Sequence, residues 1–279
     1  MKPVSTITTT HLFPELHNQL IELLRSLPLD AWEKPTVCTP WTVKEVVAHL
    51  LDGYCRRLSF QRDQLPMPPP ETAITNEEDL INFLNQLNAD WIKATKRLSP
   101  ALLIAMLEVT GPALHQFLAT LDPEAPAMFS VGWAGEDMSA NWFDLAREYT
   151  EQWHHQQHIR EAVGQPGLIS RQFLYPVFDT FLRALPYTYR TVDAQNGTTI
   201  TFEITGEAGG QWSLQRETTG WQLFVGTTDQ AVAHVQLPQD IAWRLFTKGI
   251  SIDEARPQVQ IEGDQQLGDQ ILQMVSIMA

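Results

Sequence analysis

The sequence NWFDLAREYTEQWHHQQHIREAV, residues 141–163, decides how the first part of this chain folds. Its apolar residues Trp142, Leu145, Tyr149 and Trp153 recur at helical spacing and predict a helix with one face toward a core. Residues 164–167, GQPG, then combine glycine and proline in the way that ends a helix. We therefore expect one long helix from about residue 141 to residue 163.

Working outward from this helix, the residues before it also follow a helical pattern. Apolar spacing predicts helices over residues 11–27, 42–58, 80–98 and 100–121. Thr42 is a candidate N-cap with Glu45 three residues later, which is a capping box, and Ser99-Pro100 opens the next helix in a similar way. Gly111-Pro112 predicts a kink or break, and the proline run at residues 66–70 predicts a loop. About four long helices are enough for a bundle.

The pattern changes after residue 167. Residues 198–205, 212–215 and 221–225 alternate like the strands of a β-meander. Residues 228–234 and 238–246 favour helices, residues 259–261 a short strand, and residues 265–274 a terminal amphipathic helix. The expected fold class is mainly α with an α+β C-terminal part, and the expected domains are residues 1–168, a four-helix bundle, and residues 169–279, a small α+β domain.

Composition limits the function classes. The 279 residues include 43% hydrophobic and 19% charged residues, which is typical of a globular protein, and the net charge is −14. With no basic run, this charge argues against nucleic acid and anionic membranes as partners. We find no stretch close to the roughly 18 uncharged apolar residues of a membrane span and no apolar core in the N-terminal MKPVSTITTT. With only two cysteines, a cytoplasmic protein without a membrane partner is expected.

The long helix also carries the candidate metal ligands. Glu151 and His155 are four residues apart, so they share one helix face, and His154 and His158 repeat the same spacing. His49, on the helix that begins at residue 42, is the candidate third ligand. Two histidines and one carboxylate with open coordination positions suit a catalytic divalent ion such as zinc.

The spacing leaves other interpretations open. Glu151 and His155 lie nearly opposite the apolar stripe, where a polar face is usually solvated. His49 lies at the edge of an apolar face, where a hydrogen-bonded core histidine would serve equally well.

Three segments together carry a family resemblance. Residues 38–52, CTPWTVKEVVAHLLD, the helices within residues 76–121, and residues 133–164 resemble the mycothiol-dependent maleylpyruvate isomerase family. That family belongs to the DinB-like superfamily of metal-binding four-helix bundles. Residues 258–264, QVQIEGD, are similar to part of the small sterol-carrier-like domain that often follows this bundle.

The resemblance implies which residues form the site. Carried over residue by residue, the metal ligands are His49, Glu151 and His155. This chain has His158 where relatives usually have Asp, so His158 could replace that carboxylate or supply another ligand. The candidates for a second layer around the ion are His158, Arg160 and Arg56.

The function implied is a metal-dependent enzyme that uses a low-molecular-weight thiol, such as mycothiol, on a small-molecule electrophile. The reaction would be a cis–trans isomerisation or an S-transfer, with zinc as the expected ion and nickel as the alternative. A metal-dependent hydrolase on the same bundle, or a non-catalytic protein that binds metal or a small ligand, are the other hypotheses. We expect Cys38 and Cys55 to be ordinary thiols and not nucleophiles.

Overall fold

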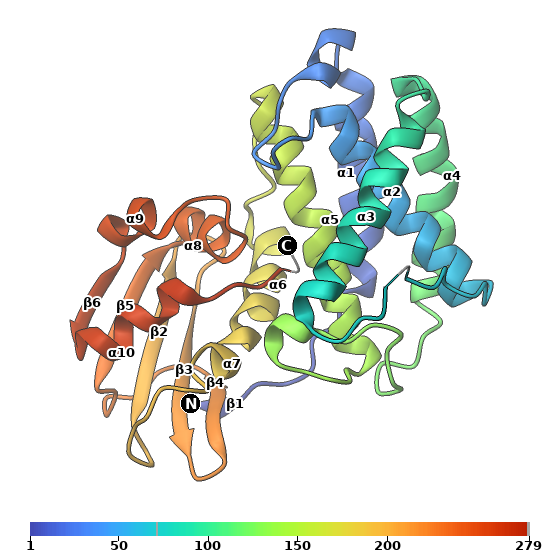
Figure 1. Cartoon of the computed structure of the whole chain (residues 1–279). Helices are drawn as coiled ribbons and strands as arrows, with labels where there is room; N and C mark the ends of the chain where they lie inside the picture. Colours follow the sequence, from blue (N-terminus) through green and yellow to red (C-terminus); the bar gives the residue numbers. More distant parts are fainter. Residues whose placement is uncertain (71, 278–279) are drawn as a thin grey trace. The chain divides into compact units, whose positions relative to one another are not determined.

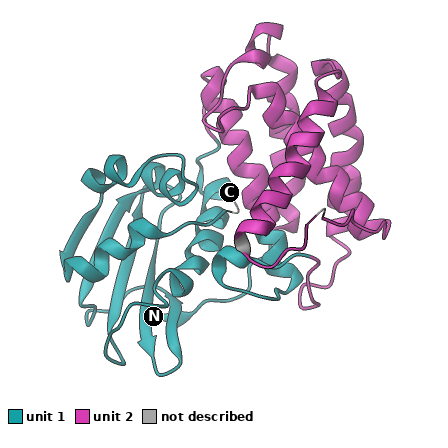
Figure 2. Ribbon diagram, in the orientation of Figure 1, with its two compact units in different colours: residues 1–8, 129–147, 168–278 teal, residues 9–128, 148–167, 279 magenta. Residues whose placement is uncertain are grey.

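The fold is that of a computed structural model, which describes residues 1–70 and 72–277. It confirms the predicted fold class, because the N-terminal part is helical and the C-terminal part combines helices with a sheet (Figure 1). The chain forms two compact units (Figure 2). The helical unit contains residues 9–128 and 148–167, and the mixed unit contains residues 1–8, 129–147 and those from 168 onward. The division into domains between residues 168 and 169 stays a prediction.

The helical unit is built on amphipathic helices that bury their apolar faces against one another. Its helices are α1 (Phe13–Ser26), α2 (Val43–Arg56), α3 (Glu77–Thr95), α4 (Pro100–Leu118) and the part of α5 (Asn141–Val163) after residue 147. Helix α2 contacts α3 and α4, and α1 contacts α4. From α5, the Gln156 amide donates to the Leu16 carbonyl of α1, and Gln152 accepts from the Tyr54 hydroxyl of α2. The core therefore lies between α5 and these helices.

The predicted starts of α2 and α4 and the predicted end of α5 are confirmed, whereas α3 begins and ends three residues earlier than expected and α4 ends three residues earlier. Thr42 and Glu45 form the capping box that starts α2, and the Ser99 side chain accepts from the Leu102 amide at the start of α4. Helix α5 ends at Val163, and Gly164 takes a φ of 68°, the left-handed conformation that glycine adopts without strain. Residues 57–62 prolong α2 as a π-helix.

Of the kink or break predicted at Gly111-Pro112, the break is wrong, because α4 is continuous from Pro100 to Leu118. Gly111 instead faces the His17 ring so closely that a Cβ at residue 111 would collide with it. The glycine thus permits a close helix–helix approach. Helix α4, which includes Glu108, is also long and apolar enough to cross a membrane by length and composition alone, which is weak evidence for a span. Some of its side chains are buried in the unit: Leu103, Leu107, Leu114, His115 and Leu118.

The mixed unit contains one sheet with the strand order β1-β4-β3-β2-β5-β6 (Figure 1). The strands are β1 (Lys2–Pro3), β2 (Thr199–Thr205), β3 (Gly210–Glu217), β4 (Gly220–Val225), β5 (Ala233–Pro238) and β6 (Gln260–Gly263). The predicted meander β2-β3-β4 is confirmed, and β5 joins it parallel to β2. The accompanying helices are α6 (Arg171–Phe181), α7 (Leu185–Thr188), α8 (Gln239–Phe246), α9 (Ile252–Ala255) and α10 (Gln265–Asp269).

The helix predicted over residues 228–234 is wrong. Residues 233–238 form β5, in which Ala233, Val235 and Leu237 are buried while His234 and Gln236 are only half-buried. This alternation has the period of two that a strand requires. The terminal helix predicted over residues 265–274 is shorter than expected, because α10 ends at Asp269 and a 3₁₀ turn follows.

Candidate metal centre

The candidate centre is built on α2 and α5. The capping box fixes the first turn of α2, so that His49 lies two turns into the helix with its ring 4.9 Å from that of Trp41. Nε2 of His49 points to α5, where it lies 3.5 Å from Oε1 of Glu151. Nδ1 of His49 is buried and has no hydrogen-bond partner within the described residues.

Helix α5 brings its polar face inside the unit. Gln152, His154, His155, Gln156, Gln157 and His158 are all buried. The alternative that this face is merely solvated is therefore wrong, because it packs against α1, α2 and the loop before α2. Buried polar groups need partners, so this face has to be satisfied by hydrogen bonds or by a bound ion.

The three predicted ligands lie together. Nε2 of His155 is 3.1 Å from Oε1 of Glu151, and the three donor atoms of His49, Glu151 and His155 are all within 4.8 Å of one another. With metal–ligand bonds of about 2.0–2.2 Å, two donors of a tetrahedral site are about 3.3 Å apart. The two measured separations are close to that value. The side chain of Glu151 is 34% exposed, against 8% for His155, so the group has one side open for a ligand.

The charges in this group fit a divalent ion. Burial, and then His154, lower the pKa of His155 to about 3, so its ring is neutral and able to bind a cation. Burial opposes ionisation of the Glu151 carboxyl, but His155 and His49 hold its pKa well below the ordinary range. No Lys or Arg pairs with Glu151 among the residues that the structure describes. A carboxylate surrounded by imidazoles and without a cationic partner has the chemistry of a metal ligand.

His154 and the two arginines take other roles. Nδ1 of His154 is 3.0 Å from the Thr150 carbonyl oxygen of its own helix. Arg56 pairs with Asp52 and donates to Asn88 at 3.0 Å. Arg160 donates to Gln156 and to two backbone carbonyls. Neither arginine forms a hydrogen bond to the three candidate ligands among the described residues, and their place in a second layer stays a prediction.

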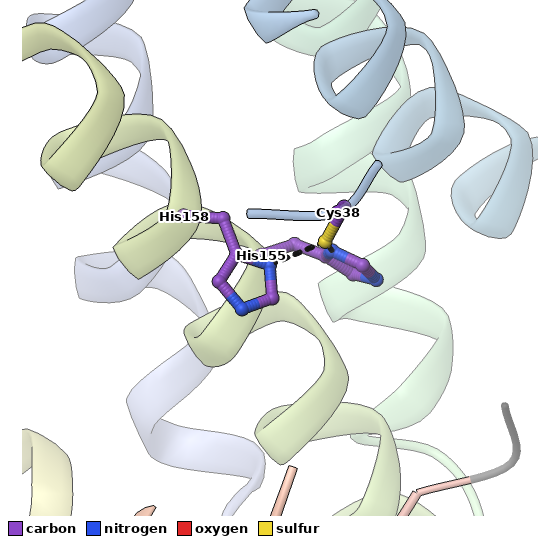
Figure 3. A group of neighbouring side chains, drawn as sticks. All are labelled: Cys38, His155 and His158. Atoms are coloured by element: carbon purple, nitrogen blue, oxygen red, sulfur yellow. Dashed lines mark hydrogen bonds between the residues drawn. The ribbon is translucent and has the colours of Figure 1, made fainter. Parts of the chain in front are cut away.

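Sequence reasoning did not predict that Cys38 lies beside His155 and His158. Its Sγ lies 2.8 Å from Nδ1 of His158 and 3.9 Å from Nδ1 of His155. Figure 3 shows Cys38 reaching these two rings of α5 from a separate loop. Burial, together with the Glu151 carboxylate, raises the pKa of this thiol to about 12. No spacing rule connects residue 38 with residue 158, and only the fold brings them together.

Comparison with known proteins gives a consistent picture. The family model described as the mycothiol maleylpyruvate isomerase N-terminal domain matches residues 13–160. A solved structure of a variant of the mycothiol-dependent maleylpyruvate isomerase has a TM-score of 0.55 and 10% identity, and covers 95% of this chain and 97% of its own. Another structure of that isomerase has a TM-score of 0.52 and 10% identity, over 88% and 91% of the chains. At this identity the structures show a shared fold alone, and no curated protein matches the sequence.

Proposed function

Since the chain belongs to the mycothiol maleylpyruvate isomerase family, whose N-terminal domain spans residues 13–160, we propose that it is a metal-dependent enzyme that uses a small thiol to isomerise an unsaturated substrate. His49, Glu151 and His155 would hold the ion, with zinc as the first candidate and nickel as the second. The observation that carries the proposal is the convergence of these three side chains from two helices on one small, partly open volume.

The role of each residue follows from its surroundings. When bound, a divalent ion supplies a positive charge that stabilises the thiolate form of a coordinated thiol near neutral pH. Glu151 contributes the one negative charge of the ligand set and lies at the open side. His155 is held by burial in its neutral, ligating form, and His49 is oriented by its contact with Trp41. The packed polar face of α5 limits access of water to the remaining sides.

The chemistry requires only reversible bonds to sulfur. Addition of the thiolate sulfur to one carbon of a conjugated cis double bond breaks the π bond, moves its electron pair onto the conjugated carbonyl group, and allows rotation about the remaining single bond. Cleavage of the same carbon–sulfur bond then returns the trans isomer and the free thiol, so that the atoms balance without an oxidant or reductant. A substrate with a leaving group would instead retain the sulfur, which is an S-transfer.

The test is isomerisation of a cis unsaturated dicarboxylate by the purified zinc-loaded protein, with and without added thiol. We expect activity that depends on thiol and falls by about 100-fold or more in Glu151→Gln, in line with the loss of a metal ligand. Glu22→Gln is the matched control, because Glu22 is exposed on α1. Isomerisation that needs no thiol would contradict the proposed use of a thiol, and hydrolysis of an ester or amide in place of isomerisation would favour the hydrolase hypothesis. Metal binding without any activity would favour the non-catalytic binding protein.

A further inference from the structure

A second ligand set lies on the other side of the His155 ring. Besides the group formed by His49, Glu151 and His155, the donor atoms of Cys38, His155 and His158 also lie within 4.8 Å of one another. We propose that Cys38, His155 and His158 bind a zinc ion of their own, through Sγ of the cysteine and Nδ1 of each histidine. This inference shares His155 with the proposed function but requires no catalytic activity.

The separations fit a zinc site with one sulfur ligand. Zinc–sulfur bonds of about 2.3 Å and zinc–nitrogen bonds of about 2.0–2.1 Å place sulfur about 3.5 Å from each nitrogen of a tetrahedral site. Sγ of Cys38 is 2.8 Å from Nδ1 of His158 and 3.9 Å from Nδ1 of His155. The expected distance lies between these values, so a shift of well under about 1 Å at the cysteine would make the two equal. Thiolate and imidazole donors together select zinc over calcium or magnesium.

The loop that carries Cys38 is held by its own hydrogen bonds. Both the amide and the hydroxyl of Thr36 donate to the Trp41 carbonyl, at 3.0 and 2.8 Å. The Cys38 amide donates to the Thr36 hydroxyl at 3.2 Å, and the Trp41 amide donates to the Cys38 carbonyl at 2.7 Å. The backbone that carries the thiol is thus fixed before any ion arrives, which lowers the cost of binding.

The two histidines of the set lie on one buried face of α5. His155 and His158 are three residues apart on α5, so they share one helix face, and both are buried. Their rings are 5.4 Å apart at 79° to each other. Figure 3 shows the sulfur and the two rings turned toward one another. Cys38 is only half-buried, which leaves a path for the ion and for the proton that the thiol releases to solvent on binding.

His155 presents a different nitrogen to each ligand set. Nε2 faces Glu151 at 3.1 Å, whereas Nδ1 faces Cys38 at 3.9 Å. One ring can therefore serve an ion on each side, when it releases its remaining N–H proton and bridges the two ions as an imidazolate. The competing interpretation is that the Cys38 thiol only donates a hydrogen bond to His158.

Cobalt(II) titration of the apoprotein separates a zinc site from a simple hydrogen bond, because a cobalt–thiolate bond gives a charge-transfer absorption band in the near ultraviolet. We expect this band in the parent protein, its loss in Cys38→Ser and in His158→Ala, and its retention in Cys55→Ser, the matched cysteine control. His49→Ala should keep the band, since it disrupts the other ligand set only. Circular dichroism checks that each variant is folded.

The protection of the thiol provides a second readout that does not depend on a structural variant of Cys38. In the Cys55→Ser protein, zinc should slow alkylation of Cys38 by a maleimide at least about tenfold, and a chelator should restore the rate. Absence of the band together with unprotected alkylation would overturn the inference. If, in that case, the parent protein still binds metal and His49→Ala does not, the second ligand set is wrong but the proposed function stands. If the band is present and His49→Ala loses no metal, the second ligand set stands and the proposed function fails.

Discussion

At the scale of single residues, the helical unit contains buried histidines outside the candidate centre as well as within it. Apart from those near the candidate centre, His17 and His115 lie between α1 and α4, with ring centroids 5.3 Å apart. Nδ1 of His17 is 3.4 Å from the Tyr54 hydroxyl, and Nε2 of His115 has no hydrogen-bond partner within the described residues. Burial lowers the pKa of His17 to about 4, and burial, followed by His17, lowers that of His115 to about 3.

These two histidines predict a loss of stability in acid. Their pKa values in the folded state are below the ordinary 6.5, so between those values the unfolded chain binds more protons than the folded one. Well above pH 6.5, neither the folded nor the unfolded chain binds these protons, so the free energy of unfolding keeps its full value. It falls by about 1.4 kcal/mol per pH unit for each histidine as the pH drops toward the folded-state pKa.

Denaturant unfolding of the parent protein and of His115→Gln at about pH 7 and about pH 5 measures this effect. The loss of stability between the two pH values should be smaller in the variant by about 1–2 kcal/mol. His11→Gln, which changes an exposed histidine, should follow the parent protein. An equal loss in all three proteins would show that the protonation of His115 does not depend on folding.

At the residue scale, the sequence predicted contacts within one helix but not those between distant segments. The i,i+4 spacing predicted that Glu151 and His155 share a helix face, and the structure brings His49 to them. The role of Cys38 could not be predicted, because it depends on a loop closed by Thr36 and Trp41 that returns to α5. Contacts between residues 117 or 120 positions apart are set by tertiary packing and leave no periodic signal.

At the scale of elements, capping signals were the most informative part of the sequence. Thr42 and Glu45 form the complete capping box, in which the Thr42 amide donates to the Glu45 carboxylate at 2.9 Å. Because α2 carries His49, the cap that fixes the start of α2 also helps to position a candidate metal ligand. We predict that Thr42→Ala lowers the free energy of unfolding by about 1 kcal/mol.

Thermal unfolding monitored by circular dichroism tests this prediction, with Thr72→Ala, at an exposed threonine without a cap role, as the control. The variant should also bind zinc more weakly, since the start of α2 would be less well fixed. A melting temperature equal to that of the control would contradict the role assigned to the cap.

The errors at the element scale have physical causes. Gly111-Pro112 predicted an interruption of α4, but the glycine serves the contact with His17, and the proline is accommodated inside the helix. The alternation over residues 233–238 covers only six residues, which was too little to predict a strand in place of the helix predicted over residues 228–234. Their pairing with β2, which runs parallel over 200–205, is a non-local contact that local propensity does not encode.

At the scale of the whole molecule, composition and periodicity were enough to predict a helical part followed by a mixed part. They did not predict that residues 1–8 and 129–147 belong with the C-terminal residues in one compact unit. Strand β1 explains part of this, because Lys2 and Pro3 pair with Val225 and Phe224 of β4. Two residues are too few to give a recognisable strand pattern in a sequence.

A ligand that binds only the folded chain stabilises it in proportion to the logarithm of its concentration. At a zinc concentration about 100-fold above the dissociation constant, the folded protein should gain about 2.7 kcal/mol. We predict that zinc raises the melting temperature of the parent protein and that a chelator reverses the change. Glu151→Gln should respond much less, and a magnesium salt at the same concentration should have little effect.

The most direct test of the central claim is the metal content of the full-length protein, purified in parallel as the parent and as His49→Ala, with His11→Ala as the matched histidine control. The account predicts bound zinc or nickel in the parent and in the control. In His49→Ala we predict at least about one equivalent less of bound metal, because this variant lacks one of the three ligands in the group of His49, Glu151 and His155. Equal metal content in all three folded proteins, or no metal in any of them after incubation with zinc, would contradict it.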